Sequence, residues 1–248
     1  MKLCFLGTGA ADWAGPDVRG ECRRFTSTLI DGCLLIDVNP DVLQRIDDKS
    51  AVTAVAFTHS HRDHFNIDAL RALAPCTVYA HESWANEIEG DGLTVVALKA
   101  GEETTAVTGH ILTPMPANHS TEKKYEQPLH YLIERDGTCI LYATDGAWLL
   151  NQEHHIIGKR TLHAAVFDAT IGDGFDGDWR IFEHNSIDMV RLMVATLNKQ
   201  NRLAEDAPVF LTHMARTLHG SQKEIEAKLE RPLIAAYDGF ATEIIANR

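Results

Sequence analysis

A short apolar run at residues 54–57 leads directly into Thr58-His59-Ser60-His61-Arg62-Asp63-His64-Phe65. This segment has the pattern H-x-H-x-D-H, so four potential metal ligands stand within six residues. Neutral imidazoles and a carboxylate suit divalent ions such as Zn²⁺. A buried strand that ends in a tight loop can turn several such side chains inward at once, whereas a His-rich surface loop would leave them in solvent. We therefore predict a metal site at the end of a strand.

Three further candidate ligands, His119, Asp145 and His213, each stand just beyond a later apolar run. Taken singly, each is typical of an ordinary polar residue that caps a strand. Strand ends that gather along one edge of a sheet sandwich would, however, bring all three to the first segment. We therefore predict a joint site of nitrogen and oxygen donors, a set that permits Zn²⁺, Mn²⁺ or Ni²⁺.

The pattern of strands and helices indicates the fold class. Asp31-Gly32 and Asp136-Gly137 predict two hairpins, because this dipeptide supplies the positive φ angles of a two-residue turn. Strands are predicted at residues 27–30, 33–36, 54–57, 77–80, 93–98, 131–133, 139–142, 165–167 and 209–211. Helices are predicted after Asn66, His81, Ser186 and Ser221. This mixture predicts an α+β fold with two mixed β-sheets sandwiched between helices, the αββα arrangement.

Composition limits the classes of protein that fit. No linker or repeat divides the chain, so we interpret residues 1–248 as one domain. A formal net charge of −12 disfavours binding to nucleic acid or to an anionic membrane. Five cysteines without a C-x-x-C pair indicate free thiols in a reducing compartment. The apolar N-terminal run stops at Gly7, too early for a signal peptide, so we predict a soluble, cytoplasmic protein.

The H-x-H-x-D-H segment and the three later ligands together resemble the metallo-β-lactamase superfamily. The similarity covers nearly the whole chain, from Leu6-Gly7-Thr8-Gly9 to Thr212-His213. It implies the αββα metallo-hydrolase fold and a site for two metal ions. One ion would be bound by His59, His61 and His119. The other would be bound by Asp63, His64 and His213, with Asp145 as a bridge. True β-lactamases have a cysteine in place of Asp145, so hydrolysis of antibiotics is not expected.

Two more motifs resemble the phosphodiesterase branch of this superfamily, which includes tRNA 3′-processing endonucleases and a cyclic-phosphate phosphodiesterase of phosphonate breakdown. They are Phe167-Asp168-Ala169-Thr170 and Glu183-His184-Asn185-Ser186. The motif Leu35-Ile36-Asp37 points the same way and suggests that Asp37 contacts a histidine ligand. Outside this family context, Asp168 and His184 would be interpreted as solvated caps.

The resemblance implies a metal-dependent phosphodiesterase that hydrolyses a small phosphodiester, with a cyclic ribosyl phosphate as one candidate. A hydroxide that bridges two divalent ions, Zn²⁺ or Mn²⁺, would attack phosphorus. We expect His184 to be the general acid, since an imidazole with a pKa of ~6.5 can protonate an alkoxide leaving group. Asp168 would orient His184. Asp63 would serve both as a ligand and as the proton acceptor from the attacking water.

Other functions remain alternatives. A tRNA 3′-processing endonuclease shares the site but needs a protruding basic or Gly-rich arm, and no long insertion of that composition is present. A thioester or lactone hydrolase of the glyoxalase II type would leave Asp168 and His184 without a role. A metal-stabilised binding module without turnover is the non-enzymatic alternative. The resemblance also suggests a homodimer, whereas the cysteines for the structural zinc of the phosphonate-pathway relatives are missing apart from Cys22.

The sequence leaves the roles of two segments undecided. Arg23 and Arg24 either meet a substrate phosphate or form a solvated turn. The segment from Gly172 to Asp178 formally matches G-x-G-x-x-G, yet its carboxylates would repel a pyrophosphate and no helix follows immediately. We interpret it as a flexible loop beside the site.

Overall fold

Two seven-stranded sheets are present in the computed structural model, which describes residues 1–174 and 177–246. The first contains, in spatial order, β14 (Ala241–Glu243), β1 (Lys2–Gly7), β2 (Ser27–Ile30), β3 (Leu34–Ile36), β4 (Ala54–Ala56), β5 (Cys76–His81) and β6 (Leu93–Leu98). The second contains β13 (Leu233–Ala235), β12 (Val209–Thr212), β11 (Ala164–Asp168), β10 (Thr138–Ala143), β9 (Leu129–Arg135), β8 (Ile111–Pro116) and β7 (Thr104–Thr105). Both sheets are mixed, because β2–β3 and β9–β10 are antiparallel pairs while β3–β4 and β10–β11 are parallel.

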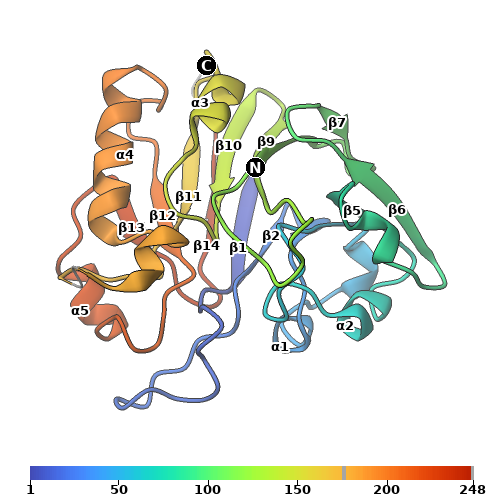
Figure 1. Ribbon diagram of the computed structural model, residues 1–248, viewed down its shortest axis with the longest axis horizontal. Helices are drawn as coiled ribbons and strands as arrows, with labels where there is room; N and C mark the ends of the chain where they lie inside the picture. Colours follow the sequence, from blue (N-terminus) through green and yellow to red (C-terminus); the bar gives the residue numbers. More distant parts are fainter. Residues whose placement is uncertain (175–176, 247–248) are drawn as a thin grey trace.

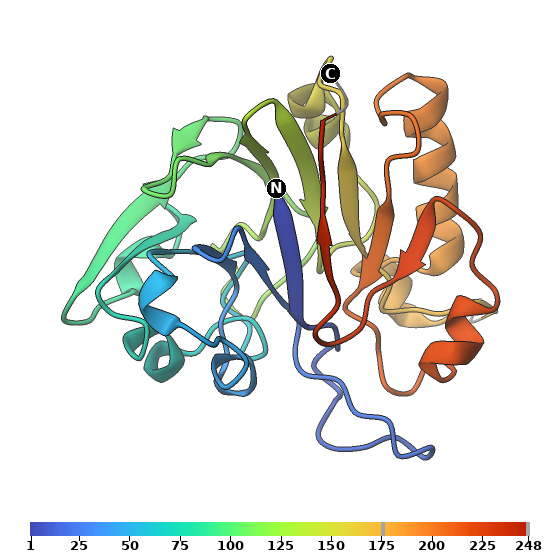
Figure 2. The same cartoon turned by 180° about the vertical axis from the view of Figure 1, so that it is seen from behind.

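Helices cover the outer faces of the two sheets (Figures 1 and 2). The α-helices are α1 (Pro40–Leu43), α2 (Ile67–Arg71), α3 (Asn151–Ile157), α4 (Ile187–Lys199) and α5 (Gln222–Glu226). In the described part of the chain, three 3₁₀ helices accompany them: η1 (Lys49–Ala51), η2 (Ala85–Glu87) and η3 (Trp179–Phe182). α1 and α2 lie beside the first sheet and α4 and α5 beside the second, so the predicted αββα sandwich is confirmed. Within the described residues, no helix is long and apolar enough to cross a membrane.

The core follows from the two-residue period of the strands, which sends alternate side chains to opposite faces. In β3, Leu34 and Ile36 point into the layer between the sheets, where they pack with residues of β9 and β10, while Leu35 packs toward α1 and α2. In β11, Val166 points into the same inner layer and Phe167 packs toward α4. The sandwich therefore has one inner core and two outer cores under the helices.

The two predicted hairpin turns have the backbone conformation that their sequences require. Asp31 and Gly32 have φ angles of 50° and 73°, and Asp136 and Gly137 have φ angles of 50° and 78°. Left-handed conformations at both central positions define the turn that matches the twist of the flanking strands. The sequence is therefore sufficient to place these two connections.

The strand β8 was not predicted, because Pro114 and Pro116 lie within it. Proline cannot donate to a β-ladder and normally argues against a strand away from an edge. Here the neighbour β7 pairs only with Ile111 and Leu112, so no strand on that side requires an N–H from either proline. β8 matters for the site, because it leads directly to His119.

The turn that follows β1 is hydrogen-bonded to the loop that follows β12 in the second sheet. After β1, the Cβ atom that a side chain would add at Gly7 would lie 2.0 Å from the carbonyl oxygen of Phe25, so only glycine fits. The carbonyl oxygen of Thr8 then accepts a hydrogen bond of 2.9 Å from the N–H of Met214. The residue that follows His213 is thereby tied to the end of β1.

Candidate metal centre

All seven predicted ligands lie in loops that follow strands, and the loops come from both sheets. The loop after β4 in the first sheet carries His59, His61, Asp63 and His64. In the second sheet, His119 follows β8, Asp145 follows β10 and His213 follows β12. The structure brings the seven side chains together as two groups of four that share Asp145. The site therefore lies where loops from the two sheets meet.

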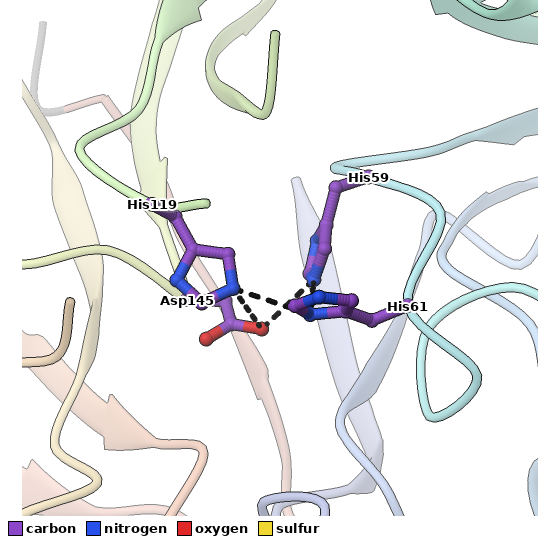
Figure 3. A group of neighbouring side chains, drawn as sticks. All are labelled: His59, His61, His119 and Asp145. Atoms are coloured by element: carbon purple, nitrogen blue, oxygen red, sulfur yellow. Dashed lines mark hydrogen bonds and ion pairs between the residues drawn. The ribbon is translucent and has the colours of Figure 1, made fainter. Parts of the chain in front are cut away.

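The first group contains His59, His61, His119 and Asp145 (Figure 3). Nε2 of His59 lies 2.9 Å from Nδ1 of His61 and 3.1 Å from Oδ2 of Asp145. Nε2 of His119 lies 3.2 Å from Nδ1 of His61 and 3.7 Å from Oδ2 of Asp145. Figure 3 shows the three imidazoles and the carboxylate converging on a common point.

The second group contains Asp63, His64, Asp145 and His213. Nε2 of His64 lies 3.2 Å from Nε2 of His213, 3.3 Å from Oδ2 of Asp63 and 3.0 Å from Oδ2 of Asp145. Nε2 of His213 lies 3.6 Å from each of the same two carboxylate oxygens. Asp145 thus takes part in both groups through one oxygen, Oδ2, which is where a bridging ligand has to stand.

The donor set fits two divalent ions. Donors that surround one Zn²⁺ tetrahedrally at 2.0–2.2 Å stand roughly 3.3–3.6 Å from one another. The separations given above run from 2.9 to 3.7 Å, and all ligand atoms of a group lie within 4.8 Å of one another. Nδ1 of His64 is engaged with Asp37 and Nδ1 of His213 with Thr170. With both Nδ1 atoms engaged in this way, the two Nε2 atoms, 3.2 Å apart, are the ring atoms that could bind a cation.

Two of the ligands are held by left-handed backbone conformations. Asp145 has a φ angle of 60° and His213 has one of 56°. Non-glycine residues adopt this region infrequently, and such conformations persist where the surrounding structure enforces them, often at functional sites.

A buried aspartate and a threonine hold the histidines that follow β4. Oδ2 of Asp37 accepts a hydrogen bond of 2.7 Å from Nδ1 of His64, the contact suggested for this residue. The Thr58 hydroxyl donates to the same oxygen over 2.7 Å and lies 3.0 Å from Nδ1 of His59. Such contacts fix the ring orientation and leave Nε2 free as the ligand atom.

The ionisable groups of the cluster shift one another's pKa values. Burial holds the pKa of His59 well below its usual value, and neighbouring His64 adds to the effect. Burial also disfavours the charged form of His64, but Asp63 and Asp37 outweigh it and raise the pKa of His64 well above its usual value. Burial works against the charge of Asp145, yet the surrounding histidines hold its pKa well below the usual value. Protons and metal ions therefore compete for the same nitrogens.

His184 and Asp168 lie beside the second group. Nδ1 of His184 donates to Oδ2 of Asp168 over 2.8 Å and lies 3.1 Å from Oδ1 of Asp145. The ring stacks on that of His213, with 5.4 Å between centroids. Burial disfavours the charged imidazole, but Asp168 and Asp145 raise the pKa of His184 well above its usual value. The Nε2 atom of a protonated His184 is thus the atom available to a substrate.

Thr170 is a residue of the site that the sequence patterns did not predict. Its hydroxyl lies 2.8 Å from Nδ1 of His213, 3.2 Å from Nδ1 of His184 and 3.1 Å from Oδ2 of Asp168. Thr58 has a similar position beside His59, with its hydroxyl 3.0 Å from Nδ1 of that ring. The signal that finds them is a hydroxyl residue beside a ligand or catalytic group at the end of a buried strand.

The structure shows what Arg23 and Arg24 contact and describes part of the segment from Gly172 to Asp178. Arg23 forms no solvated turn, because it is 8% exposed and donates to Oγ1 of Thr8 and to Gln222 over 2.7 and 2.6 Å. Arg24 pairs with Asp238 at 3.2 Å. These contacts use both side chains within the fold. Of the segment from Gly172 to Asp178, residues 175–176 lie outside the described residues, and Gly172 helps line a cavity of about 690 Å³.

The effect of pH on stability can test the environment of His219, a histidine that contacts the backbone next to Asp168. Its Nε2 donates to the carbonyl oxygen of Ala169 over 2.7 Å, and burial lowers its pKa from 6.5 to about 4. The unfolded chain therefore binds a proton before the native protein does, so this residue causes stability to fall as pH drops from about 6.5 toward 4, by up to about 3 kcal/mol. His219→Gln is expected to reduce the loss of stability between pH 7.5 and pH 5, as measured by urea unfolding. Parallel pH profiles for the two proteins would contradict this assignment.

The chain belongs to the family described as the β-lactamase superfamily domain, whose model matches residues 9–214. This places it in the metallo-β-lactamase superfamily, whose members are metal-dependent hydrolases, and its His/Asp cluster is of the kind that holds their metal ions. No curated protein sequence matches the chain.

Solved structures of low sequence identity share the fold. Zn²⁺-bound PqqB from Methylobacterium extorquens is 18% identical, with a TM-score of 0.75 and coverage of 98% of this chain and 100% of that one. A diphosphatase of the PhnP family is 20% identical, with a TM-score of 0.72 and coverage of 97% and 96%. The short form of human tRNase Z is 15% identical, with a TM-score of 0.71 and coverage of 99% and 100%. At these identities the likeness establishes the architecture.

Proposed function

We propose that this protein is a dinuclear metal-dependent phosphodiesterase that acts on a small phosphodiester. The observation that carries the proposal is the His184–Asp168 pair, joined over 2.8 Å beside the two ligand groups. Hydrolysis of a phosphodiester expels an alkoxide, which needs a proton as it leaves. A thioester expels a thiolate, which needs that proton far less. The pair therefore has a use in diester hydrolysis that it lacks in thioester hydrolysis.

The residues divide the work of hydrolysis. Two divalent ions bound by the seven ligands would neutralise charge on the phosphoryl oxygens and lower the pKa of bound water. Asp63 would hold a metal ion through Oδ2, which lies in the second group, and would accept on its other carboxylate oxygen the proton that the attacking water loses. Nε2 of His184 donates a proton to the departing oxygen, while Asp168 holds the ring through Nδ1 and favours its charged form. Asp145 spans the two groups and fixes their separation.

A small substrate is favoured over a tRNA precursor. With a formal charge of −12, most of the surface does not attract a polyanion, and affinity for nucleic acid depends largely on neutralising its phosphates. A single diester can still be drawn to the local positive charge of two bound cations. One of the solved structures with this fold is a diphosphatase. This likeness supports a reaction at phosphorus, but it does not identify the substrate.

The test compares metal content with hydrolysis. Purified protein is expected to hold two divalent ions per chain and to hydrolyse bis-p-nitrophenyl phosphate, and a chelator should remove both properties. Added Zn²⁺ or Mn²⁺ should restore them and show which ion supports turnover.

A substrate panel separates the competing functions. A thioester, a lactone, a tRNA precursor and a cyclic ribosyl phosphate should be tested at equal enzyme concentration. Faster turnover of the thioester or lactone than of any diester would reject the proposal, and preference for the tRNA precursor would favour the endonuclease. Metal-loaded protein that hydrolyses none of them would favour a binding module.

A further inference from the structure

The segment that follows Asp145 is unusually constrained. Asp145 and Trp148 both have left-handed backbones, with φ angles of 60° and 56°. For a bulky aromatic residue this conformation is an outlier that the surroundings must enforce. Residues 145–148 therefore do not hold their shape by local preference, and contacts from elsewhere in the chain have to maintain it.

Asn185 supplies one set of these contacts. Its side chain is 1% exposed, with Nδ2 donating to the carbonyl oxygen of Gly146 and Oδ1 accepting from the N–H of Trp148, both over 2.8 Å. Its backbone N–H donates to Oδ1 of Asp168 over 3.2 Å, and its carbonyl oxygen accepts from Ile171 over 3.0 Å. Every polar group of this buried residue is thus used, and together they join the Asp145 segment to the Asp168 segment.

Asn118 supplies a second set from the opposite side. Its Nδ2 donates to the carbonyl oxygen of Ala147 over 2.9 Å, and its own carbonyl oxygen accepts from the N–H of Ala147 over 3.1 Å. Asn118 directly precedes His119, and Asn185 directly follows His184. The residues after Asp145 are therefore held between Asn118, which precedes a metal ligand, and Asn185, which follows the general acid.

We propose that Asn185 is a positioning residue that fixes the bridging carboxylate of Asp145 relative to the proton donor His184. The assignment rests on the proposed function. Only a short amide offers a donor to Gly146 and an acceptor to Trp148 at the same time. Aspartate has the same shape, but its second oxygen would face the carbonyl oxygen of Gly146 and repel it. Aspartate at position 185 would therefore lose the buried hydrogen bond to Gly146, and this loss would displace the neighbouring Asp145.

The test is Asn185→Asp, with Asn198→Asp as the matched control. Asn198 is exposed on α4, so the control makes the same chemical change away from the site. We expect Asn185→Asp to weaken metal binding about 10–100-fold, measured by competition with a chromophoric chelator, as for other residues that orient metal ligands. The kcat value should fall by a similar factor while KM changes less than about threefold. The control should match the unmodified protein in all three quantities.

The metal-affinity measurement and two replacement variants keep the outcome decisive. Metal affinity is measured without substrate, so it tests the role of Asn185 even if no phosphodiester proves to be a substrate. Should Asn185→Asp not fold, Asn185→Ser, whose single hydroxyl cannot contact both Gly146 and Trp148, and Asn118→Ala, which removes the side-chain contact to Ala147, take its place. Both variants are then expected to weaken metal binding. A variant that loses only urea stability, while metal affinity and kcat stay within about twofold, would assign Asn185 a structural role and overturn the proposal.

Discussion

Asp145→Asn is expected to lower kcat/KM for a phosphodiester on the order of 10³-fold or more. The carboxylate lies in both ligand groups through Oδ2, so its loss weakens the binding of two ions at once. Charge stabilisation by a metal ion contributes several kcal/mol to the transition state, and each 1.36 kcal/mol corresponds to a factor of ten in rate. Asparagine tolerates the left-handed backbone at this position, so the fold should persist. Metal analysis and steady-state kinetics on the same preparation provide the measurement.

Asp136→Asn is the matched control for that experiment. Asp136 also has a left-handed backbone, with a φ angle of 50°, but it lies in the hairpin turn between β9 and β10 with its side chain 90% exposed. The control is expected to keep two metal ions and full activity. If Asp145→Asn retained both ions and most of its activity, the bridging role would be wrong.

His184→Ala is expected to slow hydrolysis in a way that depends on the leaving group. General acid catalysis contributes about 10²–10⁴-fold, and the benefit is greatest where the departing oxygen is most basic. For a diester with an unactivated alkoxide, such as a cyclic ribosyl phosphate, we expect a loss within that range. For bis-p-nitrophenyl phosphate the loss should be below about tenfold, because p-nitrophenolate leaves without a proton. The kcat values for the two substrates provide the comparison.

His155→Ala serves as the control for this second experiment, because His155 is an exposed histidine on α3. It should leave both rates unchanged. Metal content should be measured for His184→Ala as well, since its ring stacks on the ligand His213. An equal loss on both substrates, with two ions still bound, would contradict the general-acid role.

Local patterns were enough to predict much of the fold. The two Asp-Gly turns follow from the backbone freedom of those residues, and α4 begins at Ile187, directly after the N-cap Ser186, whose side chain accepts from the N–H of Met189. Other elements depended on distant partners. β14 exists because residues 241–243 pair with β1. α5 ends at Glu226, although Leu229, beyond its end, still packs against the core. A short window of sequence predicts neither the presence of β14 nor the end of α5.

The sequence by itself determined the chemistry of the site. Imidazole and carboxylate donors at the ends of apolar runs define which ions can bind, because ligand preference belongs to the residue type. The tertiary structure decided how these donors are arranged. The shared position of Oδ2 of Asp145, the left-handed backbones and the contacts of Asn118 and Asn185 arise only when strand ends from two sheets meet. Distances between groups so far apart in the chain are set by packing and hydrogen bonding, and local residue preferences do not encode them.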